Sequence, residues 1–242
     1  FTVKAKASFV YVNHEYVEEL ANLRKAAEQA RAHGFLGKNV LGTGVDIEIE
    51  FIEGQGSYVA GEETAMLESM QGRPAMPRQK PPFYPTDFGL YGKPTLVNNV
   101  ETLCNIPPLL RNGAAWFKQV GTEKSPGTML FSLSGAVNRP GVYELPMGTP
   151  IRTLIYECGG GISGGRKVKA VFPGGPSFAM LTADQLDTPM DFENLKQAGT
   201  GLGSAGVIVV DDQTCMVETA LKYTNFFKVE SCGQCPPCRM GT

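Results

Sequence analysis

The chain has 242 residues, with 22 Lys and Arg against 24 Asp and Glu, and a formal net charge of -2. Its length allows one large or two modest domains. The charges are balanced and form neither a basic stripe nor a like-charged block. The sequence therefore lacks the usual features of a protein that binds nucleic acid or a lipid surface. No apolar run approaches the roughly 18 residues of a spanning helix, and no signal segment opens the chain, so we expect neither direct membrane insertion nor export.

The first third of the chain alternates between strand and helix patterns. Apolar residues predict strands over 9–12 and 45–51, and helix-forming stretches predict helices over 20–30 and 65–70. We expect Asn13 to cap the first helix and Gly34 to end it. This alternation predicts an α/β layer structure with a mostly parallel sheet.

A proline-rich segment from 73 to 94 follows. Its prolines exclude regular structure, and its aromatic residues argue against disorder, so we interpret it as an ordered binding loop. A helix is expected from 98 to 112, broken or restarted at Pro107-Pro108.

The polar stretch from 118 to 126 is the expected domain boundary. Beyond it we predict a hairpin, a helix and further strands, an order typical of the β-grasp (ubiquitin-like) fold. A final helix is expected from 214 to about 228, capped by Asp211 and Asp212. The predicted elements of this part are strands over 129–137, 142–145, 168–172 and 206–210 and a helix over 149–157.

The last helix leads into three cysteines with two-residue gaps, Cys232, Cys235 and Cys238. Thiolates at this spacing can hold three corners of a [4Fe-4S] cluster. A zinc site or uncoordinated thiols are the alternatives, but two overlapping CxxC units crowd a tetrahedral zinc ion. A fourth ligand is missing from the motif. The internal candidates for this ligand are the three other cysteines, Cys104, Cys158 and Cys215. Each stands alone in an apolar or helical stretch that is typical of buried structural cysteines, so we expect the ligand elsewhere. Cysteine usage as a whole indicates a reducing compartment.

The segment Glu230-Ser-Cys-Gly-Gln-Cys-Pro-Pro-Cys-Arg239 resembles the cluster loop of the flavoprotein subunit of NADH:quinone oxidoreductase, respiratory complex I. In that family the fourth cysteine lies further along, in a helical bundle. The resemblance therefore implies that the sequence is a fragment lacking both ends, with further parts of the nucleotide pockets upstream of Phe1.

A second segment, Tyr58-Val-Ala-Gly-Glu-Glu-Thr-Ala65, resembles the flavin and nicotinamide site of the same family. On their own, Glu62 and Glu63 would be read as charges that complement a helix dipole. Ala60 stands where the family usually has cysteine, a change that we expect to leave flavin binding intact. The resemblance implies contacts to the isoalloxazine ring from Tyr58, Gly61, Glu62 and Glu63, to FMN from Asn98 and Asn99, and to NADH from Glu63, Lys80 and Phe83, with Glu63 as the catalytic-site residue.

The resemblance also implies a domain plan and an activity. The plan is an incomplete Rossmann-like α/β FMN/NADH-binding domain over 1–118, a β-grasp (SLBB-like) domain over 119–211 and the start of a helical [4Fe-4S]-binding domain over 212–242. The implied activity passes a hydride from NADH to FMN, and then single electrons to the cluster. The alternatives are a flavoprotein subunit of an NAD-linked hydrogenase or formate dehydrogenase and, in another class, a zinc-binding interaction module.

The expected partners follow from the same resemblance. They are NADH and other subunits of a multi-subunit redox complex, including a thioredoxin-like [2Fe-2S] subunit and an iron–sulfur subunit that accepts electrons. No nucleic acid is expected. The expected location is cytoplasmic, peripheral on the inner face of a membrane through partner subunits.

Overall fold

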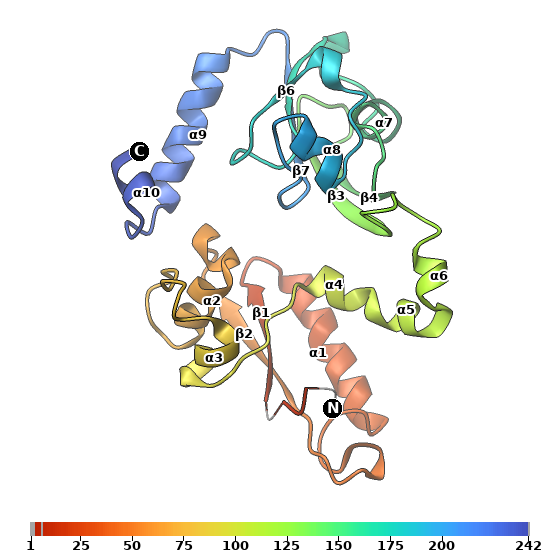
Figure 1. Ribbon diagram of the computed structural model, residues 1–242, viewed down its shortest axis with the longest axis vertical. Coiled ribbons are helices and arrows are strands. Elements are labelled where there is room, and N and C mark those ends of the chain that lie inside the picture. The colour runs from red at the N-terminus through yellow and green to blue at the C-terminus, as the bar shows by residue number, and fades with distance from the viewer. Residues whose placement is uncertain (1–2, 6, 242) are drawn as a thin grey trace. The chain divides into compact units, whose positions relative to one another are not determined.

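The computed structural model describes residues 3–5 and 7–241 (Figure 1). They form two compact units. The first contains the described residues up to Val97 together with those from Thr224 onward, and the second runs from Asn98 to Tyr223. Within the described ranges no helix has both the length and the apolar content needed to cross a membrane.

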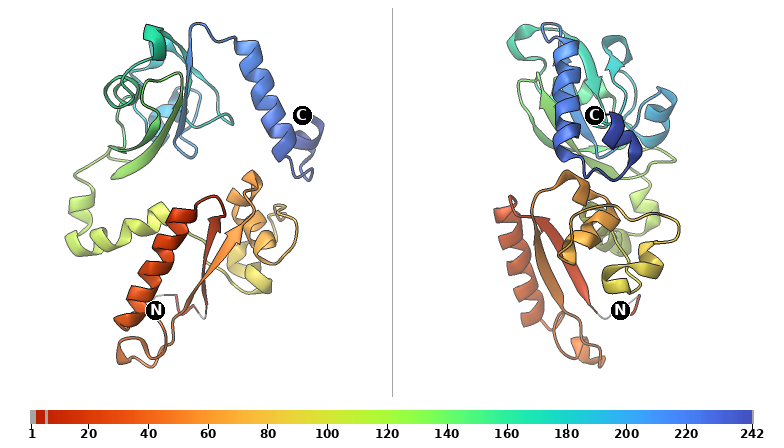
Figure 2. Two further views of the ribbon diagram at one scale, coloured as in Figure 1. Left: turned by 180° about the vertical axis from the view of Figure 1, so that it is seen from behind. Right: turned by 90° about the vertical axis from the view of Figure 1, so that its left-hand side faces the viewer.

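The first unit is built on a strand–helix–strand motif. Strand β1 pairs in parallel with β2, from Ser8 opposite Ile49 to Asn13 opposite Gly54, and α1 connects them. Figure 2 shows α1 on one face of this sheet, with α2 and α3 on the other. The predicted order of alternating strands and helices is confirmed. The bounds are β1 (Ser8–Asn13), α1 (Val17–Ala32), β2 (Ile49–Gly54), α2 (Glu63–Met70) and α3 (Pro85–Phe88).

Two local predictions in this unit are wrong in detail. The second strand begins at Ile49 rather than at residue 45, because Ile47 forms an isolated antiparallel bridge with Gly37 instead of joining the sheet. Asn13 does not cap α1; its side chain accepts a hydrogen bond from the Glu15 N–H at 3.2 Å, which makes a turn before the helix. Gly34 does follow α1 with φ of 72°, the left-handed conformation expected of a helix stop.

The proline-rich segment is ordered by a largely buried ion pair. Arg78 pairs through Nε with Glu68 of α2, and both side chains are 14% exposed. The same guanidinium donates hydrogen bonds to the carbonyls of Phe88, at 2.5 Å, and Gly89, at 3.0 Å. These bonds fasten the loop to α2, as expected of an ordered loop.

The second unit begins with three short helices and continues as a five-stranded mixed sheet. Its strand order is β4-β3-β7-β5-β6, with β3 and β7 parallel and the other pairs antiparallel. The bounds are α4 (Val100–Cys104), α5 (Ile106–Asn112), α6 (Ala114–Phe117), β3 (Thr128–Gly135), β4 (Gly141–Pro146), α7 (Ile151–Thr153), β5 (Val168–Phe172), β6 (Leu181–Thr182), α8 (Phe192–Gln197) and β7 (Gly206–Asp211).

One face of this sheet carries the main hydrophobic core. Phe131 and Val207 from the strands and Leu154 from the helical segment after α7 have no exposed surface. On the opposite face Phe172 packs with Tyr223 of α9 (Met216–Glu230), edge to face with ring centroids 5.0 Å apart. Burial of these apolar side chains fixes the sheet. The whole described chain therefore has an α/β fold with a parallel and a mixed sheet.

Three predicted helices in this part differ in their bounds. The predicted 98–112 helix is two helices, and Pro107 falls in the first turn of α5, where a missing N–H costs nothing. The predicted 149–157 helix is α7 followed by a π-helical turn, Leu154–Cys158. The last helix starts at Met216; Asp211 accepts a hydrogen bond from the Thr214 N–H at 2.9 Å, in the turn just before it.

Candidate functional site

The site begins at the turn between β2 and α2. A 3-10 turn spans Tyr58–Gly61, and Glu62 then caps α2. Its Oε2 accepts hydrogen bonds from the backbone N–H groups of Thr64 and Ala65, both at 2.9 Å. These are donors that a helix start leaves without partners. Because Thr64 and Ala65 are fully buried, the cap holds the Glu62 carboxylate in a fixed position.

Lys80 joins this carboxylate to its neighbour. The Lys80 Nζ donates to Glu62 Oε1 at 2.8 Å and to Glu63 Oε1 at 3.0 Å. We refer to Glu62, Glu63 and Lys80 as the Lys80 triad. The structure thus brings together three residues that the family resemblance assigns to the nicotinamide and flavin site.

The triad shifts the ionisation of two of its members. Partial burial opposes ionisation of the Glu62 carboxyl, but hydrogen bonds from Lys80, Thr64 and the Ala65 N–H outweigh it and lower its pKa. The hydrogen bonds to Glu62 and then Glu63 raise the pKa of Lys80. Glu62 and Lys80 therefore remain charged at neutral pH.

Two aromatic rings lie in the same unit with accessible surface. Tyr58 is 55% exposed and Phe83 is 44% exposed. Each is oriented by an edge-to-face contact, Tyr58 with Phe226 at 5.2 Å between centroids and Phe83 with Phe88 at 6.0 Å. A Cβ added to Gly61 would meet no atom within 4 Å, so a flat ring can approach the backbone there. The residues present therefore fit a flavin and a nicotinamide.

The predicted FMN contacts Asn98 and Asn99 belong to the second unit. Both side chains are exposed. Asn99 caps α4, and its Oδ1 accepts a hydrogen bond from the Thr102 N–H at 3.1 Å. The predicted helix start after the pair is thus confirmed.

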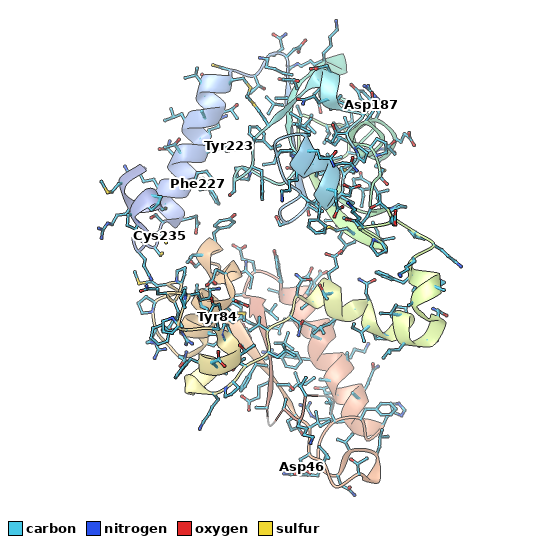
Figure 3. All side chains as sticks on the ribbon, viewed as in Figure 1. Asp46, Tyr84, Asp187, Tyr223, Phe227 and Cys235 are labelled. Atoms are coloured by element: carbon cyan, nitrogen blue, oxygen red, sulfur yellow. The ribbon has the colours of Figure 1, made fainter. Side chains whose placement is uncertain are left out.

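Cys232 and Cys235 lie in the turn between α9 and α10 (Pro236–Gly241), where Figure 3 labels Cys235, and Cys238 lies within α10. The Ser231 hydroxyl accepts a hydrogen bond from the Gly233 N–H at 3.2 Å and lies 3.1 Å from the Cys238 Sγ. In the described part of the chain, no three Cys, His, Asp or Glu side chains converge as a metal site. None of the six cysteines, all within that part, forms a disulfide. Three thiols at this spacing fit an iron–sulfur cluster by their chemistry, since thiolate is its ligand.

The other three cysteines lie in the second unit. Cys158 is half-buried and packs against the main core, as expected of a structural cysteine. Cys104 and Cys215 are exposed, so the expectation of burial is wrong for these two. Cys104 ends a five-residue helix, and Cys215 precedes α9, where too few apolar neighbours cover the thiol.

Two contacts that the sequence did not reveal join the cysteine loop to earlier segments of the same unit. Glu230 Oε2 accepts a hydrogen bond from the Tyr58 N–H at 3.0 Å, and Gln234 Nε2 donates one to the Pro77 carbonyl at 2.6 Å. Glu230 and Cys232 also line a cleft of about 400 Å³, together with Tyr11 and Arg73. The sequence offered one indication of a special role for Glu230: it is a carboxylate at the end of a predicted helix, where the helix dipole disfavours negative charge.

Sequence comparison finds three family profiles along the chain, in non-overlapping segments. Residues 1–108 match the Nuo51 FMN-binding domain. Residues 130–181 match the SLBB domain, and residues 218–242 match the NADH-ubiquinone oxidoreductase-F iron-sulfur binding region. The Lys80 triad lies in the first match and the three cysteines lie in the third.

Individual relatives extend over the whole chain. The second NADH-quinone oxidoreductase F subunit of Rhizobium meliloti (strain 1021) is 48% identical over 241 residues, which are 100% of this chain and 57% of that protein. The corresponding F subunit of Escherichia coli (strain K12) is 46% identical over 241 residues, covering 100% of this chain and 54% of that protein. The chain therefore spans about half the length of these relatives.

Solved structures give the same fold. A chain of the NAD+-reducing [NiFe]-hydrogenase in the H2-reduced state superposes with a TM-score of 0.83 at 36% sequence identity, over 98% of this chain and 38% of that one. The air-oxidized state of the same enzyme gives a TM-score of 0.83 over 99% of this chain and 39% of that one. Over its full length the chain is therefore similar to NADH-quinone oxidoreductase F subunits, and two of its segments match an FMN-binding domain and an iron-sulfur binding region.

Proposed function

We propose that this chain is part of the electron-input subunit of an NADH:quinone oxidoreductase. One observation carries the proposal. Lys80 is ion-paired with both Glu62 and Glu63, in the compact unit that exposes Tyr58 and Phe83 and contains the cysteine loop. Charged hydrogen-bonding groups beside aromatic surfaces suit a nicotinamide dinucleotide on a flavin ring.

When bound, FMN accepts a hydride from the nicotinamide, and the [4Fe-4S] cluster takes up single electrons. The protein's task is to orient the reactants and exclude water, because this transfer needs no protein acid or base. Tyr58 and the Gly61 backbone would lie against the flavin, and Phe83 would stack on a ring of the dinucleotide.

The polar groups have separate tasks. Lys80 and Glu63 would exchange part of their mutual ion pair for hydrogen bonds to NADH. Glu62 would stay fixed as the cap of α2, because Thr64 and Ala65 hold its other oxygen. Asn98 and Asn99 would contact FMN.

The cluster would be held by Cys232, Cys235 and Cys238, with Arg239 next to the last ligand. A nearby positive charge and backbone N–H groups favour the reduced cluster and so raise its potential. The fourth ligand is proposed to come from a residue outside this sequence.

The proposed domain plan has three parts, with the FMN/NADH-binding domain over 1–118, a β-grasp domain over 119–211 and the start of the cluster-binding helices over 212–242. The strand order β4-β3-β7-β5-β6 supports the middle part, because it places the first and last strands side by side in parallel with a helical segment packed on the sheet. The three family matches each fall mainly within one of these parts.

A second candidate is the flavoprotein subunit of an NAD-linked hydrogenase, with the formate dehydrogenase counterpart as a variant of it. The 36% sequence identity to a chain of the NAD+-reducing [NiFe]-hydrogenase supports this candidate. Both candidates place the chain in a multi-subunit redox complex. For the respiratory enzyme we propose a thioredoxin-like [2Fe-2S] partner, an iron–sulfur subunit that accepts electrons, and a peripheral position on the cytoplasmic face of a membrane. Co-purifying proteins separate the candidates, since membrane proton pumps indicate the respiratory enzyme and a nickel or molybdenum protein indicates the other.

Metal and flavin analysis of the purified complex tests the proposal. Iron with acid-labile sulfide and a flavin absorption spectrum are the expected result. Zinc without flavin would reject it in favour of a zinc-binding interaction module, in which Glu62 and Glu63 only cap a helix.

A further inference from the structure

Glu230 ends α9 with a negative charge, two residues before the first cysteine of the motif. The carbonyl groups at the end of a helix carry partial negative charge, so a carboxylate there is locally unfavourable. Such a conflict between local preference and observed structure is typical of residues with a long-range or functional role. The contacts of Glu230 identify this role.

The carboxylate of Glu230 caps a different element. The 3-10 turn Tyr58–Gly61 has no side-chain cap of its own, since Ser57 makes no such bond. The first N–H of a helical turn lacks an internal partner, and Glu230 Oε2 supplies one to the Tyr58 N–H at 3.0 Å, across 172 positions of sequence. Hydrogen bonds with a charged acceptor are stronger than neutral ones.

A second contact from the same helix face holds the Tyr58 side chain. Phe226 precedes Glu230 by one helical turn, so the two side chains lie on the same face. The Phe226 ring meets the Tyr58 ring edge to face, with centroids 5.2 Å apart. The end of α9 therefore holds Tyr58 by both its backbone and its ring.

We propose that Glu230 is a positioning residue that sets the separation between the flavin-facing turn Tyr58–Gly61 and the thiol of Cys232. The inference rests on the proposed function, in which Tyr58 lies against the flavin and Cys232 binds the cluster. Electron transfer slows steeply as donor and acceptor move apart, so a hydrogen bond that fixes this separation controls the transfer rate. The Gln234 bond to Pro77, at 2.6 Å, lies two residues after Cys232, and Glu230 lies two residues before it, so the two bonds hold this cysteine from either side.

The test uses the flavin- and iron-loaded complex with Glu230→Ala, Glu230→Gln and the control Glu218→Ala. Glu218 is an exposed glutamate in the first turn of the same helix, where a negative charge suits the dipole. Rapid mixing with NADH separates the bleaching of the flavin, measured by absorption, from the later reduction of the cluster, measured by freeze-quench EPR.

In Glu230→Ala we expect the flavin-to-cluster rate to fall about tenfold, because loss of one charge-assisted hydrogen bond lowers the population of the fixed arrangement by about that factor. Flavin content, iron content and the KM for NADH should stay at their wild-type values. Glu230→Gln keeps an acceptor oxygen and should restore most of the rate, and Glu218→Ala should match the wild type.

Two results would overturn the inference. One is a wild-type transfer rate in Glu230→Ala. The other is an equal loss of rate, or of bound flavin and iron, in both Glu230 variants, because a tether should be rescued by the glutamine. If the wild-type complex itself shows no bleaching by NADH, the proposed function fails instead, so the two failures are distinguishable.

Discussion

Each of the two compact units is stabilised by a different kind of contact. The second, from Asn98 to Tyr223, surrounds a continuous apolar core that includes Phe131, Leu154 and Val207. In the described residues of the first unit, the buried apolar side chains are scattered, and charged contacts such as Arg78 with Glu68 and the Lys80 triad fix the loops. Aromatic rings are exposed in both units, among them Tyr58 in the first and Phe192 in the second. The comparison indicates that an apolar core makes the second unit a scaffold, although it also contains the proposed FMN contacts Asn98 and Asn99. In the first unit, which contains the Lys80 triad, charged contacts order the loops.

The largest stability effect should come from the scaffold core. Phe131→Ala removes a side chain with 0% exposure and should lower the free energy of unfolding by about 3 to 5 kcal/mol. Leu130→Ala is the matched control, because this neighbour points to the other face of β3 and is 44% exposed; it should cost less than about 1 kcal/mol. Urea unfolding measures both. Equal losses at the two positions would contradict the scaffold description.

A smaller effect, confined to the first unit, is expected from its polar contacts. Arg78→Ala leaves Glu68 with a single partner and removes the bonds to two loop carbonyls, so the loop over 73–94 should be destabilised by about 3 kcal/mol. Arg24→Ala breaks an exposed pair with Glu53 and should cost less than about 1 kcal/mol. Hydrogen exchange of the amides in the 73–94 loop distinguishes the two variants, because it should become faster only in Arg78→Ala. Unchanged exchange in Arg78→Ala would show that this ion pair does not order the loop.

The contrast also explains what could be predicted from sequence. The cysteine motif and the Glu62-Glu63 pair are contiguous, so their chemistry is visible in the sequence alone. Short apolar runs likewise predicted β1, β3 and β7. The link between Glu230 and Tyr58 joins positions 172 apart, and no local pattern reports such a contact. The start of β2 was misplaced because Ile47 pairs outside the sheet while keeping the strand pattern.

Removal of one triad carboxylate should have a moderate effect on substrate binding. Glu63→Ala should raise the KM for NADH about tenfold, corresponding to one charge-assisted hydrogen bond. The fold should persist, because Glu62 rather than Glu63 caps α2. Glu53→Ala, an exposed glutamate of β2, is the control in steady-state kinetics. An unaltered KM would remove Glu63 from the pocket.

The smallest expected effect is that of pH on the triad. The pKa of Glu62 is lowered from 4.5 and the pKa of Lys80 is raised from 10.5. The stabilising charge of Glu62 in the triad is lost only when the pH falls through the lowered pKa of Glu62. The charge of Lys80 is lost only when the pH rises through the raised pKa of Lys80. The KM for NADH should therefore stay level between about pH 6 and 8. A titration in this window that disappears in Lys80→Met would contradict the assigned charges.

The central claim is that the three-cysteine loop receives electrons from a flavin held by the same protein. EPR of the NADH-reduced complex with Cys235→Ser tests it most directly, with Cys215→Ser as the control outside the motif. The account predicts that Cys235→Ser keeps FMN and its bleaching by NADH but loses the cluster signal, whereas Cys215→Ser keeps both. An unchanged cluster signal in Cys235→Ser would contradict it.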